Sequence, residues 1–375
     1  MVEYCDALIV GGGPAGSSCA WMLSRAGLDV VVLDRARFPR DKVCAGWITP
    51  QVIAELDIDP GDYAQTRTWQ PITGFEVGLI GSDHSVAASY ERPISFGIRR
   101  CEFDDFLLRR SGARLRLGAE TASLRRVGAC WIADDALCAP VLIGAGGHFC
   151  PVARLLNGTD LTAIVAAREI EMLLDDGEAG ASPVDPARPE LYFCRDLQGY
   201  GWCVRKGAYL NVGFGRRDPR ALPADTAAFV EFLRARRRLP PAASSSAWHG
   251  HAYRLAPDAV ARRIVDHGVL LAGDSAGVAY GESGEGIRPA IESGLLAAST
   301  IIEAAGHYDR DRLQPYADSL RRRLGASAAA GRLSAIVAAA LPAAVARRLL
   351  ASRWFVRHVV LDRWFLHTSD VALVA

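Results

Sequence analysis

The amino-acid sequence predicts an α/β fold in which an antiparallel β-sheet layer is inserted into a domain built on a parallel sheet, with helices at the carboxyl end. The chain begins with a buried strand, Ala7–Val10, a glycine-rich turn and a helix. A second strand, glycine-rich turn and helix follow residue 268. Between the two, short strands are broken by glycine, serine and proline, which is typical of antiparallel sheets. This order indicates nucleotide-binding pieces that are dispersed along the chain.

Composition limits the class of protein. The 375 residues suffice for one large domain and a smaller one. Half of them are hydrophobic, as in a well-packed enzyme, and a formal net charge of +1 gives no reason to expect a nucleic-acid partner. The nine cysteines include no C-x-x-C pair, so neither a disulfide framework nor a zinc site is expected. The sequence shows no signal peptide, with its charged region followed by an apolar one, and no apolar run of the roughly 18 residues that a membrane span needs. We therefore expect a cytoplasmic protein.

The elements follow from hydrophobic periodicity. Apolar residues at helical spacing predict a helix over Ser17–Ala26, which Gly27 ends, and the β-branched run Asp29–Leu33 predicts an interior parallel strand. Further along, the pattern predicts a helix over Glu102–Arg110, strands ending in Val141–Gly144 and a hairpin over Gly199–Arg216. It then predicts a strand over Gly268–Gly273 and a helix over Glu285–Ala304. From Arg332 onward the spacing is helical and is interrupted at Pro342. We therefore expect a discontinuous cofactor domain (1–68, 99–160 and 262–325), a β-sheet substrate domain (69–98 and 161–261) and a carboxyl-terminal helical segment (326–375).

The most specific motif is the glycine turn after the first strand. Gly11, Gly13 and Gly16 satisfy G-x-G-x-x-G, with a strand before them and a helix after them. The first glycine allows a tight turn, the second lets a pyrophosphate approach the backbone, and the third lets helix and strand pack closely. The helix amino terminus adds free N–H groups and partial positive charge. Because Asp34 ends the second strand, where an acid binds the ribose hydroxyls, the motif predicts a bound dinucleotide in a Rossmann-like domain.

A second motif decides which dinucleotide is expected. The strand that ends in Gly273-Asp274 is followed by Gly281, Gly284 and Gly286 and then by a helix. An acid at that strand end can bond the polyol of a ribityl chain, and the helix amino terminus can face the flavin N1–C2=O edge, where negative charge gathers on reduction. Alone, this turn could be an ordinary strand–turn–helix with a solvated aspartate. Together, the two turns predict FAD.

These residues and three further segments resemble the geranylgeranyl reductase family of FAD-dependent oxidoreductases, within the aromatic-hydroxylase-like FAD superfamily. Phe38–Gly46, F-P-R-D-K-V-C-A-G, is similar to the family's F-P-R-x-K-x-C-x-G segment. Arg100–Asp104 is similar to its R-x-x-F-D helix start. Tyr200–Trp202, with Gly207 and Gly213–Gly215, is similar to its Y-x-W-x-F-P-x-G hairpin. The likeness spans about residues 5 to 305.

The resemblance implies an aromatic-hydroxylase type of FAD-binding domain with an antiparallel layer that roofs the flavin ring. By analogy, Arg100 lies against the FAD, Cys44 and its neighbours approach the ring, and Tyr200 and Trp202 line an apolar substrate tunnel. The expected cofactor-binding residues are Gly11, Gly13, Pro14, Ala15, Gly16, Asp34, Arg35, Lys42, Cys44, Ala45, Gly46, Arg100, Asp274, Gly284, Gly286 and Ile287. The expected catalytic residues are Cys44, Tyr200 and Trp202.

Three departures from the family concern the substrate and the reaction more than the nucleotide site. Gly146 stands where the family's G-A-D-G has a carboxylate, Val204-Arg205 replaces the F-P pair, and Asp34 replaces the commoner glutamate.

The expected site residues also have structural interpretations. Cys44 is either a proton-handling thiol beside the flavin or a small buried packing residue. Tyr200 and Trp202 share one face of a strand, which suits a wall over an apolar substrate and also ordinary core packing. His249 and His251 alternate on a strand-like stretch, but no third ligand is near in sequence, so no metal is expected.

The carboxyl-terminal residues combine arginines with large aromatics. They are Arg347, Arg348, Arg353, Trp354, Phe355, Arg357, Arg363, Trp364 and Phe365. We interpret them as terminal helices that close the substrate layer, with the arginines reaching to solvent. The alternative is an interfacial helix, which would make the protein peripheral to a membrane.

Three functions remain open at this stage. The first is reduction of a small apolar substrate, isoprenoid or polyketide-like, by hydride from flavin N5, with NAD(P)H or another electron donor that has no Rossmann domain of its own. The second is a flavin monooxygenase or dehydrogenase of a natural-product pathway. The third is a non-redox cyclase or isomerase that uses FAD as an electrostatic scaffold. A flavin-dependent halogenase would need a lysine shortly after the amino-terminal nucleotide-binding unit. Residues 43–205 contain no lysine, so this class is disfavoured.

Overall fold

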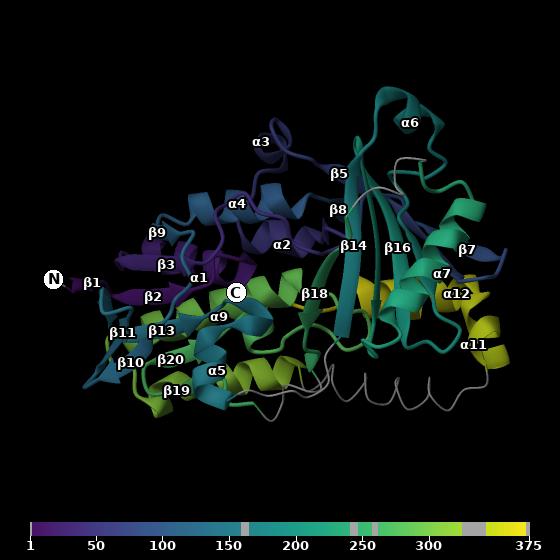
Figure 1. Ribbon diagram of the computed structural model, residues 1–375. Helices are drawn as coiled ribbons and strands as arrows, with labels where there is room; N and C mark the ends of the chain where they lie inside the picture. Colours follow the sequence, from purple (N-terminus) through teal and green to yellow (C-terminus); the bar gives the residue numbers. More distant parts are fainter. Residues whose placement is uncertain (1, 159–164, 241–246, 257–261, 325–342, 373–375) are drawn as a thin grey trace.

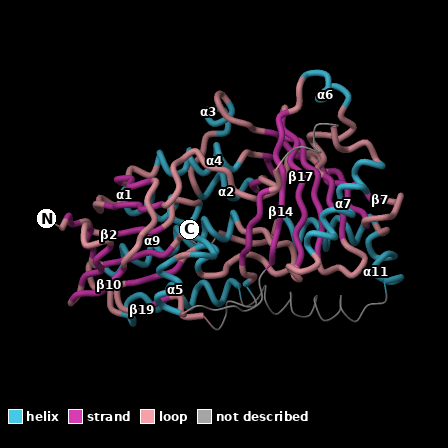
Figure 2. The backbone as a smooth tube through the Cα atoms, in the orientation of Figure 1, coloured by secondary structure: helices cyan, strands magenta, loops and turns pink. Residues whose placement is uncertain are grey.

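The computed structural model describes residues 2–158, 165–240, 247–256, 262–324 and 343–372. Two bodies lie side by side: a parallel sheet with its helices and a larger, mostly antiparallel sheet (Figure 1). The backbone trace in Figure 2 shows the strands of each body gathered together, although their segments alternate along the chain. The expected borders near residues 160, 261 and 325, and the expected helical stretch from Arg332 to Pro342, fall outside the described residues.

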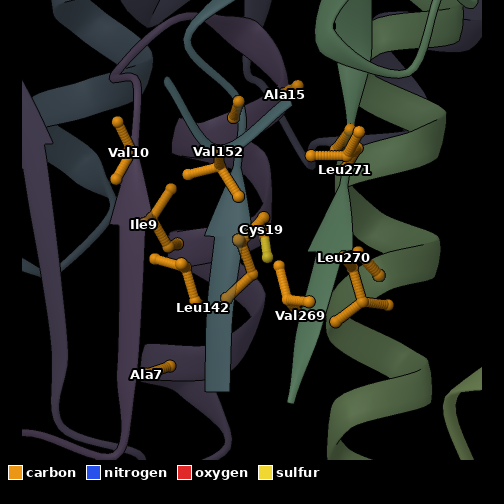
Figure 3. Packing of buried hydrophobic residues seen from close by; sticks show 14 of the residues in the cluster. Ala7, Ile9, Val10, Ala15, Cys19, Leu142, Val152, Val269, Leu270 and Leu271 are labelled. Atoms are coloured by element: carbon orange, nitrogen blue, oxygen red, sulfur yellow. The ribbon is translucent and has the colours of Figure 1, made fainter. Parts of the chain in front are cut away.

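The parallel sheet forms from short buried strands. Its order is β19 (Val265–Asp266), β20 (Val269–Leu271), β13 (Val141–Gly144), β2 (Ala7–Val10), β3 (Val30–Asp34) and β9 (Arg114–Leu117), and only the edge pair β19–β20 is antiparallel. Every residue of β2 and β13 is buried, as expected for strands covered on both faces. Figure 3 shows Ile9, Leu142 and Leu270 on the neighbouring strands β2, β13 and β20, and Cys19 and Val152 belong to the same buried cluster.

Two helices bring their amino termini to the carboxyl edge of this sheet. They are α1 (Pro14–Arg25), which follows β2, and α9 (Ile287–Ala304), which follows β20 after a turn. Gly294 lets them touch, because a Cβ there would lie 2.2 Å from the carbonyl oxygen of Ala15. This edge of a parallel sheet is the usual place for a ligand.

Smaller elements surround the parallel sheet. They are α2 (Pro50–Glu55), α3 (Pro60–Ala64), α4 (Arg100–Arg110), α5 (Pro151–Asn157), a sheet of β1 (Glu3–Tyr4), β12 (Leu137–Ala139), β11 (Cys130–Ala133) and β10 (Leu124–Val127), and a sheet of β4 (Trp47–Ile48), β8 (Ser95–Gly97) and β5 (Gln70–Ile72).

The second body is a seven-stranded sheet. Its order is β18 (His249–Tyr253), β14 (Val165–Leu173), β17 (Tyr209–Arg216), β16 (Gly199–Lys206), β15 (Glu190–Phe193), β6 (Gly74–Leu79) and β7 (Ser85–Ser89). All neighbours are antiparallel except β15 and β6. Helix α7 (Leu222–Ala235) covers one face, where Phe229 and Leu233 are buried. The other face turns towards the parallel-sheet body. The short helix α6 (Asp176–Ala181) lies beyond β14.

The carboxyl-terminal residues pack under the seven-stranded sheet. Helices α11 (Ala343–Leu350) and α12 (Arg353–Phe355) lead into a π-helical stretch, Val356–Phe365, whose buried side chains join the core of that sheet. The chain then returns to α9, where the buried Arg288 donates to the carbonyl oxygens of His367 (3.1 Å) and Asp370 (2.8 Å). Among the described residues, no helix has the length and apolar character needed to cross a bilayer.

The expected and observed elements agree best in the parallel sheet. The strands Ala7–Val10 and Val141–Gly144 are where the sequence predicts them, and β16 and β17 form the hairpin expected over Gly199–Arg216. Two differences lie in the second layer. The stretch expected to be a sheet contains α7, whose buried Leu222, Thr226, Phe229 and Leu233 are spaced as one helix face. Strands β5 and β8 pair in a separate small sheet instead of joining the large one.

Candidate active site

The first glycine turn is shaped by close backbone contacts. Gly11 has φ +114°, and a Cβ on it would lie 2.3 Å from the carbonyl group of Ala145, at the end of β13. A Cβ on Gly16 would lie 1.9 Å from the Gly11 carbonyl oxygen. Gly13 is the N-cap of α1 and offers no side-chain cap, so the first N–H groups of the helix are open to an anion.

Asp34 braces this turn. One carboxylate oxygen accepts the N–H of Gly12 at 2.7 Å and the other accepts the N–H of Ala36 at 2.8 Å. The carboxylate therefore ties the end of β3 to the glycine turn and still borders the cavity described next.

A cavity of about 410 Å³ extends from the glycine turn to the seven-stranded sheet. Of the residues predicted for the site, only Gly11 and Gly16 do not line this cavity. Both glycines are packed against other backbone atoms inside the turn. The lining ones are Gly13, Pro14, Ala15, Asp34, Arg35, Lys42, Cys44, Ala45, Gly46, Arg100, Tyr200, Trp202, Asp274, Gly284, Gly286 and Ile287. The structure thus gathers residues that are up to 274 positions apart in the sequence, from Gly13 to Ile287.

The donors in this cavity fit an FAD molecule. At one end, the uncapped amino terminus of α1 meets Arg40, whose Nη1 is buried with no hydrogen-bond partner among the described residues, and whose Nη2 lies 3.1 Å from Asp104. An unpartnered buried guanidinium nitrogen beside a helix amino terminus suits a phosphate or ribose oxygen. The amino terminus of α9 lies further along, at Gly286, and the Glu285 carboxylate accepts the Arg288 N–H there at 2.9 Å. The far end is aromatic, as a flavin ring and its substrate require.

Lys42, His251 and Asp274 form a charged group at the middle of the cavity. Lys42 Nζ lies 2.5 Å from His251 Nε2, and that nitrogen lies 3.5 Å from Asp274 Oδ2. Burial lowers the pKa of Lys42 to about 8. Burial alone would raise the pKa of Asp274, but the His251 contact and the charge of Lys42 lower it to about 2. The carboxylate expected to hold the ribityl chain is therefore kept ionised.

Arg100 is fixed by a buried ion pair at the start of α4. Its Nε and Nη2 donate to the two carboxylate oxygens of Asp104, both at 2.8 Å. This two-point contact holds the guanidinium plane against the cavity wall, beside Cys44. Burial raises the pKa of the Cys44 thiol, and the charge of Arg100 opposes that rise.

The segment 44–46 is clamped from the seven-stranded sheet. The Cys44 N–H donates to Glu169 Oε2 at 2.7 Å, and the Cys44 carbonyl accepts from Asn211 Nδ2 at 3.3 Å. Lys206 Nζ donates to the Ala45 carbonyl at 3.2 Å. Gly46 has φ +71°, and a Cβ on it would lie 2.4 Å from the Ile98 carbonyl oxygen. The position of Cys44 is thus set by residues of β14, β16 and β17.

Aromatic side chains make the wall of the cavity opposite the glycine turn. Tyr200 lies between Trp202 and Phe365, with ring centroids 6.0 and 5.2 Å away. Its hydroxyl donates to the Ser283 carbonyl at 2.6 Å, which ties the hairpin to the second glycine turn. Trp47 stands next to Phe365 at 6.3 Å. Because the Tyr200 hydroxyl is taken up by Ser283, the rings present an apolar surface to this end of the cavity.

Several of these residues were not among the predicted ones. Arg40 lies inside the quoted Phe38–Gly46 segment, so its position there was a usable signal. His251 was considered only as a metal ligand, and its approach to Lys42 joins positions 209 apart. Glu169 and Asn211 gave no sequence signal, because they sit on a sheet face that only the fold turns towards Cys44. Gly146, which replaces the family's carboxylate, also lines the cavity.

Comparisons with known proteins agree with this arrangement. A family model described as FAD dependent oxidoreductase matches residues 6–74. The menaquinone reductase of Mycobacterium tuberculosis is 28% identical over 325 residues, which cover 80% of this chain and 77% of that one. The geranylgeranyl diphosphate reductase of Rhodobacter capsulatus is 28% identical over 321 residues, which cover 79% and 75%.

Solved structures show the same fold. A geranylgeranyl bacteriochlorophyll reductase-like protein from Thermoplasma acidophilum superposes with a TM-score of 0.76 at 18% identity, over 100% of both chains. A single-residue mutant of halogenase PltM in complex with FAD gives a TM-score of 0.69 at 17% identity, over 97% of this chain and 85% of that one. These comparisons confirm the predicted fold class, FAD as the cofactor and the resemblance to geranylgeranyl reductases.

Proposed function

We propose that this chain, an FAD-dependent oxidoreductase, reduces a carbon–carbon double bond of an apolar isoprenoid substrate. The observation that carries the proposal is the aromatic end of the cavity, where Tyr200, Trp202 and Phe365 face the segment 44–46. Relatives named menaquinone reductase and geranylgeranyl diphosphate reductase support it, because a prenyl chain is common to the compounds in both names.

Bound FAD would supply a hydride at N5, and the chain supplies binding, orientation and a proton. The open amino terminus of α1 and Arg40 would hold the pyrophosphate, and Asp274 the ribityl hydroxyls. The start of α9 would turn its first N–H groups toward the pyrimidine edge of the ring, beside Glu285, which accepts the Arg288 N–H.

The aromatic wall would position the substrate. Tyr200 and Trp202 have few rotamers left, because the Tyr200 hydroxyl donates to Ser283 and the Trp202 indole donates to Asn211 at 2.7 Å. Rigid walls hold a double bond close to the ring and exclude water from it. The Cys44 thiol, kept protonated by burial, is the nearest acid that the clamped segment presents to that space.

The test is turnover without oxygen. The holoenzyme, reduced with dithionite, is mixed anaerobically with geranylgeranyl diphosphate or with a menaquinone, and the products are weighed by mass spectrometry. We expect a gain of two hydrogens and oxidation of the flavin. A requirement for oxygen with gain of one oxygen atom would instead show a monooxygenase. An unchanged mass with altered chromatography would show a cyclase or isomerase.

Contact with a membrane remains an alternative use of the carboxyl-terminal residues. Trp354 is 67% exposed next to Arg353 and Arg357, while the other face of this segment is buried under the sheet. Flotation with anionic liposomes compares the wild type with Trp354→Ser. Equal recovery of both proteins in the floating fraction would remove this role for Trp354.

A further inference from the structure

A second cavity lies behind the Cys44 segment. Its volume is about 350 Å³, and it shares with the first cavity the residues that separate the two, among them Lys42, Cys44, Arg100 and His251. The rest of its lining comes from the seven-stranded sheet and the start of α4, and consists of Arg99, Cys101, Glu169, Glu171, Asn211 and His249. A cavity of this size and polarity holds water.

The polar lining follows from the register of the sheet. Along β14, Glu169 and Glu171 point to the same face, and Glu169 is paired with His249 of β18. Asn211 of β17 is paired with Glu171. The aromatic residues Tyr200 and Trp202 lie on the same face, further along β16. One sheet face is thus aromatic where it meets the first cavity and ionisable where it meets the second.

The two glutamates differ in their partners. Glu171 contacts two cations, Lys206 at 2.6 Å and Arg99 at 3.0 Å, which hold its pKa below the ordinary value despite burial. Among the described residues, Glu169 accepts only neutral donors, the Cys44 N–H and the Asn211 amide. Burial raises the pKa of Glu169 to about 7, which suits a group that gains and loses a proton near neutrality.

We propose that the second cavity is the proton entry of the enzyme and that Glu169 passes protons through it to the Cys44 thiol. Both residues line the cavity, so one or two water molecules can join them. Glu169 touches neither the flavin cavity nor the substrate wall, and it acts through Cys44.

The proton balance rests on the proposed reduction. Bound reduced FAD would supply a hydride to one alkene carbon, and the other carbon takes the thiol proton, so that the Cys44 S–H bond breaks as a C–H bond forms. The thiolate then regains a proton as the Glu169 O–H bond breaks. Water in the second cavity reprotonates Glu169, and a two-electron donor such as NAD(P)H restores the flavin.

The charged and titratable groups around Glu169 decide how the relay responds to pH. They are Asp41, Lys42 and Cys44 of the segment before β4, Arg99 before α4, Arg100 and Cys101 of α4, Lys206 of β16, Glu171 of β14, and His249 and His251 of β18. Despite burial, the carboxylate partners of Arg99 and Arg100 hold the pKa of both guanidinium groups above the ordinary value, and Glu171 is held ionised by its two cations. Burial lowers the pKa of Lys42 to about 8, so Glu169 is the carboxyl of this group that exchanges a proton near pH 7.

The first arm of the test needs no substrate. Alkylation of Cys44 in the holoenzyme is followed by peptide mass spectrometry between about pH 5 and 10 for the wild type and Glu169→Gln. Gln keeps an acceptor for the Cys44 N–H but has no carboxyl proton or charge. We expect Glu169→Gln to lower the apparent pKa of the thiol and raise its alkylation rate several-fold at mildly alkaline pH. If the alkylation rate of Cys44 depended on pH in the same way in both proteins, Glu169 would not act on the Cys44 thiol and the proposal would be overturned.

Glu190→Gln is the matched control. Glu190 is a buried carboxyl of the same sheet, on the opposite face beside Tyr192 and Arg238. We expect it to leave Cys44 alkylation within about twofold of the wild type, since Glu190 lies on the sheet face opposite to Asn211 and Glu169. An equal change in both variants would show a general loosening of the sheet and overturn the relay.

The second arm uses turnover of the prenyl substrate. In the wild type, kcat should fall as pH rises through about 7, because the relay acts in its protonated form. Glu169→Gln should reduce kcat at least tenfold, flatten this profile, and be rescued in part by added formate. Loss of rate without rescue would show a structural role. If neither protein reduces a double bond, the proposed function fails, and the alkylation arm still decides whether Glu169 controls Cys44.

Discussion

The Asn211 side chain accepts the Trp202 indole N–H at 2.7 Å through its Oδ1. Its Nδ2 donates to the Cys44 carbonyl at 3.3 Å and to Glu169 Oε2 at 3.3 Å. One buried amide therefore fixes the aromatic wall and the Cys44 segment relative to each other. Because an amide is both donor and acceptor, no other side chain of this size can make the same contacts.

We therefore expect Asn211→Asp to be more harmful than its size suggests. It keeps the acceptor for Trp202 but loses the donor to Cys44 and adds a carboxylate next to Glu169. Loss of one buried bond with an unpaired carbonyl costs about 1–3 kcal/mol. Turnover should fall by roughly a hundredfold through misplacement of the site. Thermal unfolding and anaerobic flavin oxidation measure the two effects, and wild-type values for both would contradict this role.

Two glycine-to-alanine substitutions distinguish the effect of a strained backbone angle from the effect of a steric clash with a neighbouring segment. Gly11→Ala and Gly27→Ala both place a Cβ at positive φ, +114° and +86°. Only Gly11 would bring that Cβ within 2.3 Å of another backbone, while Gly27 has nothing within 4 Å. We expect Gly27→Ala to cost about 1–2 kcal/mol and to keep FAD. Gly11→Ala should lose the bound flavin, which absorbance of the purified protein shows. Equal flavin content would contradict the argument.

Lys42 gives a pH dependence of stability whose sign is fixed. Its folded pKa of about 8 lies below its ordinary value, so between about pH 8 and 10.5 the unfolded chain binds more protons than the folded one. The free energy of unfolding of the apoprotein should therefore rise with pH across this window, relative to Lys42→Met. Urea titrations of both proteins at several pH values give the difference. A difference that is flat or falls with pH would contradict it.

Arg288 joins the carboxyl-terminal residues to α9. It is 2% exposed, its Nε donates to Glu292 at 2.9 Å, and it holds two carbonyl groups of the tail. We expect Arg288→Met to destabilise the protein by about 3–5 kcal/mol, because Glu292 stays buried with one partner fewer. The residues after Val356 should become sensitive to trypsin. Trp354→Ser, an exposed change in the same tail that leaves every arginine in place, is the control and should leave the digestion pattern intact.

The sequence predicts the phosphate end of the site better than the ring end. Gly11, Gly13 and Asp34 lie within one continuous strand–turn–helix–strand unit, so local pattern and spacing suffice. The rest of the site depends on contacts such as that of Lys42 with His251, which are 209 positions apart and meet only in the folded chain. Likewise, α7 was missed because the alternating strands on both sides dominated the pattern, although Phe229 and Leu233 were at helical spacing.

The path of the chain has a consequence for biosynthesis. The glycine turn that would hold the phosphates is local in sequence, but Gly11 packs against the Ala145 backbone and Ala15 packs against Gly294 of α9. Contacts between residues so far apart in the chain slow the folding of a domain. We therefore expect FAD to bind only after the segments from Gly11 to Gly294 have assembled, so that cofactor uptake reports completion of the parallel-sheet body.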